Sequence, residues 1–70
     1  MELNNAGFYH YVKQFELKVE RHKVDKDKAS AKAAALAYGR MEGFFIAFNQ
    51  PKEWLEEVTR LKGLYIKYVL

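Results

Sequence analysis

The stretch that decides the fold is residues 51–70, which read PKEWLEEVTRLKGLYIKYVL. At about 100° per residue, its large apolar side chains fall on one side of a helix and most of its charged side chains on the other. The apolar members are Trp54, Leu55, Val58, Leu61, Tyr65, Tyr68 and Val69. Pro51 suits the first position of a helix, because that position needs no backbone N–H. This pattern predicts a helix.

Gly63 leaves one alternative for the end of this segment. A helix that ended at Gly63 would free residues 64–70 to form a strand. However, the apolar stripe continues past the glycine without a break in phase. We therefore predict a helix over residues 51–69.

Residues 5–23 carry a second helical stripe. Its members are Phe8, Tyr11, Val12, Phe15, Val19 and His22. Residues 15–20 alternate apolar and polar side chains, which favours a strand. A longer strand would need apolar residues at positions 13 and 21, which are Lys13 and Arg21. The helical period accounts for more positions, so we predict a helix over residues 5–23.

Residues 26–48 predict a central helix, with Asp25 or Asp27 as its N-cap. Its alanine-rich beginning has high helix propensity. One apolar stripe comprises Tyr38, Met41, Phe45 and Phe48, flanked by Ala34, Ala37 and Phe44. A separate row of small residues, spaced by four, comprises Ala31, Ala35, Gly39, Gly43 and Ala47. Such a row lets a neighbouring helix approach closely. We expect that neighbour to be a helix of the same chain, and a second copy is the alternative.

Three helices predict an all-α, compact three-helix bundle that forms a single domain over residues 1–70. A chain of 70 residues buries only about 60% of the surface that its unfolded form exposes. The sequence contains no cysteine, so disulfides do not supplement the core. We therefore expect a homodimer in which the second copy completes the core.

The charge distribution and the chain start bear on partners and location. The formal net charge is +3, and residues 13–32 hold seven basic and four acidic side chains. The first residues show no secretory signal pattern. Runs without charge, such as Gly43 to Pro51, are far shorter than the ~20 residues of a membrane span. We expect a cytoplasmic protein with no membrane partner.

The sequence offers no recognisable catalytic or metal-binding set. Apart from tyrosines, the hydroxyl candidates are Ser30 and Thr59, and nucleophilic catalysis also needs a base and an orienting group. The closely spaced carboxylates of helix 51–69 lie on its polar side. His22 and Asp25 give two metal ligands where three or four are needed. We predict no enzyme activity, no catalytic residue, no metal and no cofactor.

The favoured hypothesis is a regulatory adaptor or inhibitor that binds a protein partner. Large side chains outside the stripes are candidates for the interface, because such residues anchor protein–protein contacts. These candidates are Tyr9, Leu17, Leu36, Arg40, Ile46 and Leu64. In the alternative reading the stripes are wide and these residues belong to the core. The small size also suits a viral or mobile-element protein that blocks host machinery.

Two further functions stay open. A basic cluster around the first connection predicts a small nucleic-acid-binding protein, whose affinity would fall steeply with salt. Its members are Lys18, Arg21, Lys23, Lys26, Lys28 and Lys32. Asp25 and Asp27 lie inside this cluster and weaken that prediction. The third function is that of a structural subunit in a larger assembly.

Overall fold

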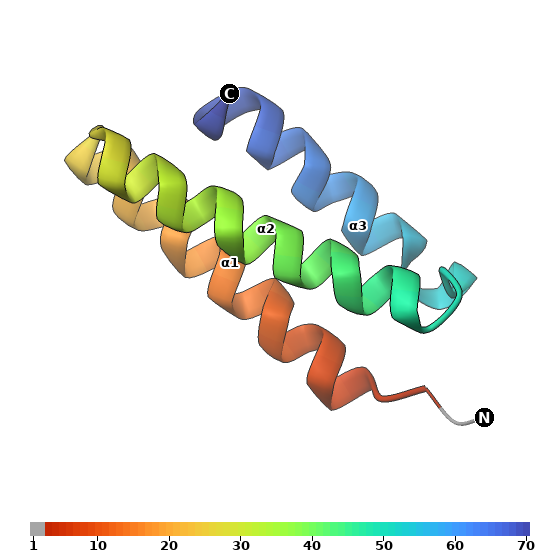
Figure 1. The fold of residues 1–70 in the computed structure, drawn as a ribbon. Helices are drawn as coiled ribbons and strands as arrows, with labels where there is room; N and C mark the ends of the chain where they lie inside the picture. The colour runs from red at the N-terminus through yellow and green to blue at the C-terminus, as the bar shows by residue number, and fades with distance from the viewer. Residues whose placement is uncertain (1–2) are drawn as a thin grey trace.

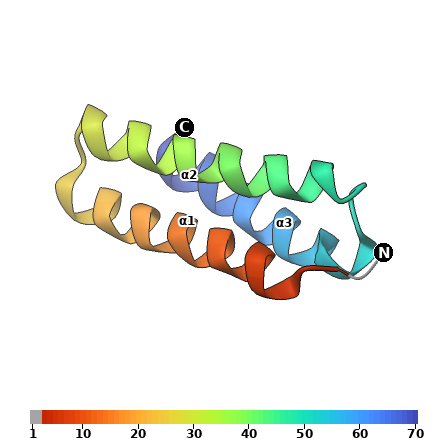
Figure 2. The ribbon, with the colours of Figure 1, turned by 60° about the horizontal axis from the view of Figure 1, so that its bottom comes forward.

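The computed structural model describes residues 3–70 and shows three helices packed as a bundle (Figure 1). α1 spans Asn5–Asp25, α2 spans Lys28–Ala47 and α3 spans Lys52–Leu64. α3 continues directly into a π-helical turn, η1, over Tyr65–Val69. α1 and α2 form an antiparallel hairpin, and α3 packs across one side of it (Figure 2). The all-α three-helix prediction is confirmed.

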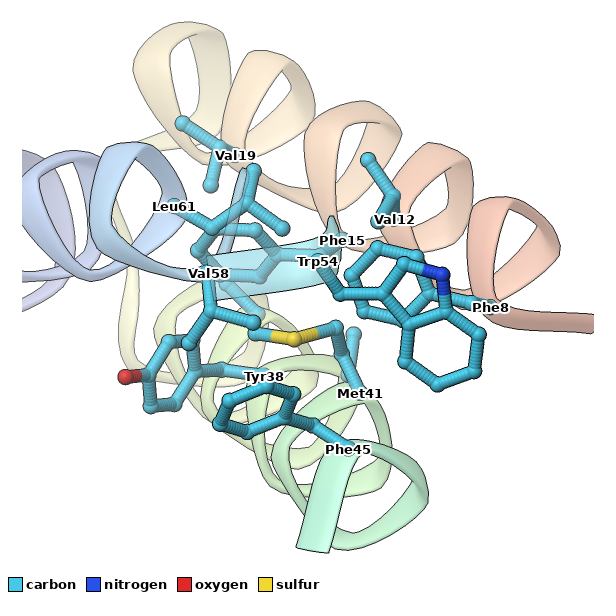
Figure 3. Close-up of a cluster of buried hydrophobic side chains, with 12 residues drawn as sticks. Phe8, Val12, Phe15, Val19, Tyr38, Met41, Phe45, Trp54, Val58 and Leu61 are labelled. Carbon is cyan, nitrogen blue, oxygen red and sulfur yellow. The ribbon is translucent and has the colours of Figure 1, made fainter. Parts of the chain in front are cut away.

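The core lies where the three apolar stripes meet (Figure 3). Its buried residues are Phe8, Val12, Phe15, Val19, Ala34, Ala37, Tyr38, Met41, Phe45, Trp54, Val58 and Leu61. Two stacked aromatic pairs join separate elements. The rings of Phe8 and Trp54 are 4.3 Å apart, and those of Tyr38 and Tyr65 are 4.5 Å apart. The helical periodicity therefore identified the central seam of each helix.

The first connection lies two residues later than predicted, because α1 runs on to Asp25 and α2 begins at Lys28. Lys26 ends α1 in a left-handed conformation (φ 51°, ψ 34°), and its N–H donates to the His22 carbonyl at 2.8 Å. The Asp27 carboxylate accepts from the Ser30 N–H at 2.8 Å, while the Asp27 N–H donates to Ser30 Oγ at 3.4 Å. This reciprocal capping box selects Asp27 over Asp25 as the N-cap.

The charge of Asp27 should make this cap sensitive to acid. Hydrogen bonds from Ser30, first from its backbone N–H, hold the pKa of Asp27 below its ordinary value. A depressed pKa means that the stabilisation is present above the unfolded pKa and is lost as pH falls through the folded pKa. We expect Asp27→Ala to lower Tm by a few degrees at neutral pH, and by much less at about pH 3. Thermal unfolding followed by circular dichroism would measure both differences.

Asp27→Asn is the matched control, because asparagine keeps an acceptor oxygen but does not titrate. The difference in Tm between Asp27→Asn and Asp27→Ala should not change with pH. An Asp27→Ala effect of equal size at both pH values would contradict a role for the carboxylate charge.

The second connection and the end of α3 also differ in detail from the prediction. Pro51 precedes α3 with an extended backbone (φ −58°, ψ 136°), so the helix begins one residue later than expected. Gly63 does not end the helix, and the strand alternative for residues 64–70 is excluded. The π-helical turn closes where the Leu70 N–H donates to the Tyr65 carbonyl at 3.0 Å.

The row of small residues on α2 does not pack inside the protomer as expected. Gly39 and Gly43 are exposed, and no atom of another helix within residues 3–70 comes within 4 Å of where a Cβ would stand. Ala47 is also exposed, while Ala31 and Ala35 are half-buried. The stripe of large apolar residues on α2 faces α1 and α3. The row of small residues lies on the other side of the helix, where Gly39 and Gly43 have no neighbouring helix.

Candidate protein-binding site

A groove runs between α1 and α2, and none of the residues that line it comes from α3. Its larger part has a volume of about 760 Å³, and a hollow of about 260 Å³ continues it toward the start of α1. The two parts share Gln14, Lys18 and Ala33. The larger part also borders Leu17 and Arg21, and the smaller part reaches His10 and Arg40. We call this feature the α1–α2 groove.

The alanine-rich segment of α2 forms one side of the groove, so the side chains on that side are short. Ala29 and Ala33 line the larger part, and Ala33 and Ala37 line the smaller part. Small side chains at these positions leave room between the two helices for another side chain or backbone. The same composition that favours the helix therefore also opens the groove.

One exposed leucine lines the groove, and a second lies next to it. Leu17 of α1 lines the larger part and is 52% exposed, and Leu36 of α2 is 55% exposed. Leu36 lies three residues after Ala33 and four before Arg40, so it neighbours two lining residues on the surface of α2 without lining the groove itself. The two leucines are 19 positions apart in sequence, and the hairpin brings their helices side by side. Both would gain from burial by a partner.

Charged side chains of both signs line the groove: the basic ones are Lys18, Arg21 and Arg40, and the acidic ones are Glu20, Asp25 and Asp27. Lys18 and Arg40 make no ion pair within residues 3–70. Arg21 is paired, because its Nε lies 2.8 Å from Asp25 Oδ2. This hydrogen bond, and then the charge of Asp25, raise the pKa of Arg21 above its ordinary value. Arg21 therefore compensates the charge of Asp25, and Lys23 compensates that of Glu20. The lining charges without an ion pair within residues 3–70 are the cations Lys18 and Arg40 and, at the first connection, the carboxylate of Asp27.

Two of the six predicted protein-binding residues line this groove: Leu17 and Arg40. The other four do not. Leu36 is exposed on α2 beside the groove. Tyr9 is exposed on α1, with its ring edge-on to Phe8 at 5.2 Å. Ile46 is exposed between α2 and α3. Leu64 is half-buried and packs against the core.

The sequence pattern missed part of the exposed apolar surface. Leu55 belongs to the predicted stripe of residues 51–69 but is exposed, because α3 packs only through the narrower seam of Trp54, Val58 and Leu61. Ile66 and Val24 are exposed as well. Ile66 and Val24 both lie outside the predicted stripes. The criterion that selected Leu17 and Leu36 could therefore have identified them as exposed residues.

The six residues of the predicted basic cluster do not form one patch. Lys18 and Arg21 line the groove. Lys23 donates to Glu20 at 2.9 Å, a hydrogen bond that raises the pKa of Lys23, and its ammonium lies 4.3 Å from the ring centre of Tyr68. The remaining three are exposed along the first connection and α2: Lys26, Lys28 and Lys32.

Other kinds of site find little support in the part of the chain that the structure describes. Among residues 3–70, no three His, Cys, Asp or Glu side chains come together as metal ligands would. No helix within these residues combines the length and the apolar character that a membrane crossing requires.

The fold and the groove define a small all-α three-helix bundle with an open inter-helix groove, partly apolar and partly basic. No protein-family model, curated protein or solved structure matches the chain.

Proposed function

We propose that this protein is a non-enzymatic adaptor or inhibitor that binds an acidic, amphipathic helix of a protein partner in the α1–α2 groove. The observation that carries the proposal is an alanine-lined groove with exposed Leu17 and the unpaired cations Lys18 and Arg40 in its lining, and exposed Leu36 next to it on α2. The groove is open along most of the hairpin, which suits an elongated occupant.

A helix is the occupant that fits the shape of the groove. Two antiparallel helices present a groove into which a third helix can lay its apolar side, as in helix-in-groove recognition. On the opposite side of the hairpin α3 already packs in this way. A partner helix would therefore extend the bundle to four helices. Because both are about half exposed, burying the rest of Leu17 and Leu36 would contribute about 1 kcal/mol each before the cost of association.

The charges indicate the character of the partner helix. Carboxylates on its flanks would face Lys18 and Arg40, and Lys32 is exposed near the α2 edge. Complementary charges of this kind mainly set specificity and speed association. The same cations also favour the second candidate, a nucleic-acid phosphate backbone. Phosphate contact, however, gives no reason for the two leucines to be exposed beside the cations.

The double variant Leu17→Gln, Leu36→Gln tests the groove. A library of displayed helical peptides would be selected on the wild-type protein, and the best peptide would then be titrated against each variant. We expect the selected peptides to carry Asp and Glu on both sides of an apolar face. The double variant should bind the best peptide roughly 30-fold more weakly, because both apolar anchors are lost.

Val24→Gln is the matched control, because Val24 is exposed on α1 but does not line the groove. It should bind the peptide as the wild type does. Circular dichroism should show all variants folded, since the replaced side chains lie outside the core. Equal peptide binding by the wild type and the double variant would refute the groove as the site.

A random-sequence oligonucleotide is the probe for the second candidate. Glutamine at positions 17 and 36 changes no charge, so phosphate binding would survive in the double variant. Oligonucleotide binding that falls steeply with salt, together with selected peptides that lack acidic residues, would replace the adaptor proposal by nucleic-acid binding.

A further inference from the structure

A second exposed apolar surface lies along α2 and α3, away from the α1–α2 groove. Ile46 and Leu55 are 54% and 52% exposed, and they border a hollow of about 260 Å³ between these helices. Ile66, further along in η1, is 54% exposed. Glu42 and Lys62 border the same hollow from α2 and α3 respectively. We call this surface the α2–α3 face.

We propose that the α2–α3 face is the interface of a homodimer whose two-fold axis runs along the bundle. In this arrangement α2 of one copy packs over α3 of the other, and the reverse. Such an interface is isologous, so each contact occurs twice. It must therefore be complementary to itself in both charge and shape.

The charge of the face is self-complementary. Glu42 and Lys62 border one hollow, so they stand at similar levels along the bundle on neighbouring helices. The two-fold axis places Glu42 opposite Lys62 of the partner subunit, and Lys62 opposite the partner's Glu42. Neither residue has an ion pair within its own chain over residues 3–70. Two reciprocal ion pairs would thus use charges that the protomer leaves uncompensated.

A neighbouring tyrosine adds no charge to this face. Burial, and then the nearby Glu42 carboxylate, raise the pKa of Tyr38 to about 12. The phenol is therefore neutral at physiological pH.

The shape of the face is also self-complementary. Ile46 and Leu55 stand at similar levels, so the same axis brings Ile46 of each copy against the partner's Leu55. Tyr65 stacks on Tyr38, which places the next residue, Ile66, near the level where α2 carries Gly39. The missing side chain at Gly39 would leave room for the partner's Ile66. The row of small residues, which no helix of the protomer covers, then acquires a neighbour.

Dimerisation would also enlarge the buried apolar surface, because a 70-residue chain has a limited core of its own. In this dimer both α1–α2 grooves remain open. The inference is therefore independent of the proposed function, and the two can fail separately.

Charge reversal tests the interface. Glu42→Lys gives two like-charged pairs across the axis, and Lys62→Glu gives two like-charged pairs of the other sign. We expect each single variant to dimerise at least tenfold more weakly than the wild type in sedimentation equilibrium. An equimolar mixture of the two variants should form a heterodimer, because both pairs are then attractive. The double variant should dimerise again by itself.

Lys13→Glu is the control, because it reverses an exposed charge on α1 outside this face. It should dimerise like the wild type. Leu55→Gln removes an apolar contact without changing charge and should also weaken the dimer tenfold or more, which covers the case in which Glu42→Lys does not fold. A wild type that stays monomeric at roughly 100 µM would overturn the proposal. So would a dimer that both charge reversals leave intact, or single variants that fail to associate on mixing.

Discussion

Trp54→Ala is expected to lower the free energy of unfolding by about 3–5 kcal/mol. Trp54 is fully buried, and its ring stacks on Phe8 with the two ring planes only 2° apart. Its Nε1–H donates to Asn5 Oδ1 at 2.7 Å, which ties the start of α3 to the start of α1. Phe44 and Phe48 of the α2 end also pack against it, at ring distances of 5.7 Å and 5.4 Å. Alanine would remove all of these contacts and leave a cavity.

The effect should be severe because α3 depends on few anchors. Trp54, Val58 and Leu61 are its only fully buried side chains within residues 3–70. Domains of ordinary stability unfold with about 5–15 kcal/mol, and a small domain lies near the lower limit. Losing the largest anchor would therefore leave little cooperative unfolding at room temperature.

Urea denaturation followed by far-ultraviolet circular dichroism measures this loss, because the variant lacks the single tryptophan for fluorescence. Trp54→Phe is the control, since phenylalanine keeps the ring against Phe8 but cannot donate to Asn5. It should lose clearly less than the alanine variant. A Trp54→Ala loss below about 1 kcal/mol would show that α3 is held in another way.

Phe15→Ala should produce a second loss of about 3–5 kcal/mol, for a different reason. Phe15 is fully buried in the middle of α1. Its ring lies 5.4 Å from that of Tyr38 on α2 and 6.5 Å from that of Tyr65 in η1. The substitution would therefore open a cavity where three elements meet, at a distance from the Trp54 cluster.

Phe15→Leu is the conservative comparison, because it keeps an apolar side chain of similar volume and should cost less than about 1.5 kcal/mol. Both variants would be measured by the same urea titration. Equal losses for leucine and alanine would indicate that the aromatic contacts with Tyr38 and Tyr65 matter more than the filled volume.

The three helices and the centre of each apolar seam were predictable from the sequence, whereas the π-helical turn after α3 was not. Phe8, Val12, Phe15 and Val19 repeat with the period of a helix and are all buried. This works because the 3.6-residue period is a local property: whatever packs on the helix, these side chains leave the chain in one direction. The same periodicity predicted that the helix continues beyond Gly63, and the structure confirms this.

Boundaries at the connections were less predictable. Two aspartates could serve as the N-cap of α2, and the choice of Asp27 depends on Lys26 adopting a left-handed conformation. Several turn conformations of similar energy could connect the two helices. The packing of the helices, together with the residues of the turn, selects one of them.

Which apolar residues stay exposed, and which residues share a surface, depends on the tertiary structure. A stripe shows the direction of a helix face but not how much of it a neighbour covers, so Leu55 was expected inside and lies outside. The small row of α2 was expected against a helix of the same chain, and Gly39 faces none. Leu17 and Arg40 line one groove only because the hairpin sets their helices side by side. The reason is physical: periodicity follows from the local geometry of one helix, whereas coverage depends on contacts between residues far apart in the chain.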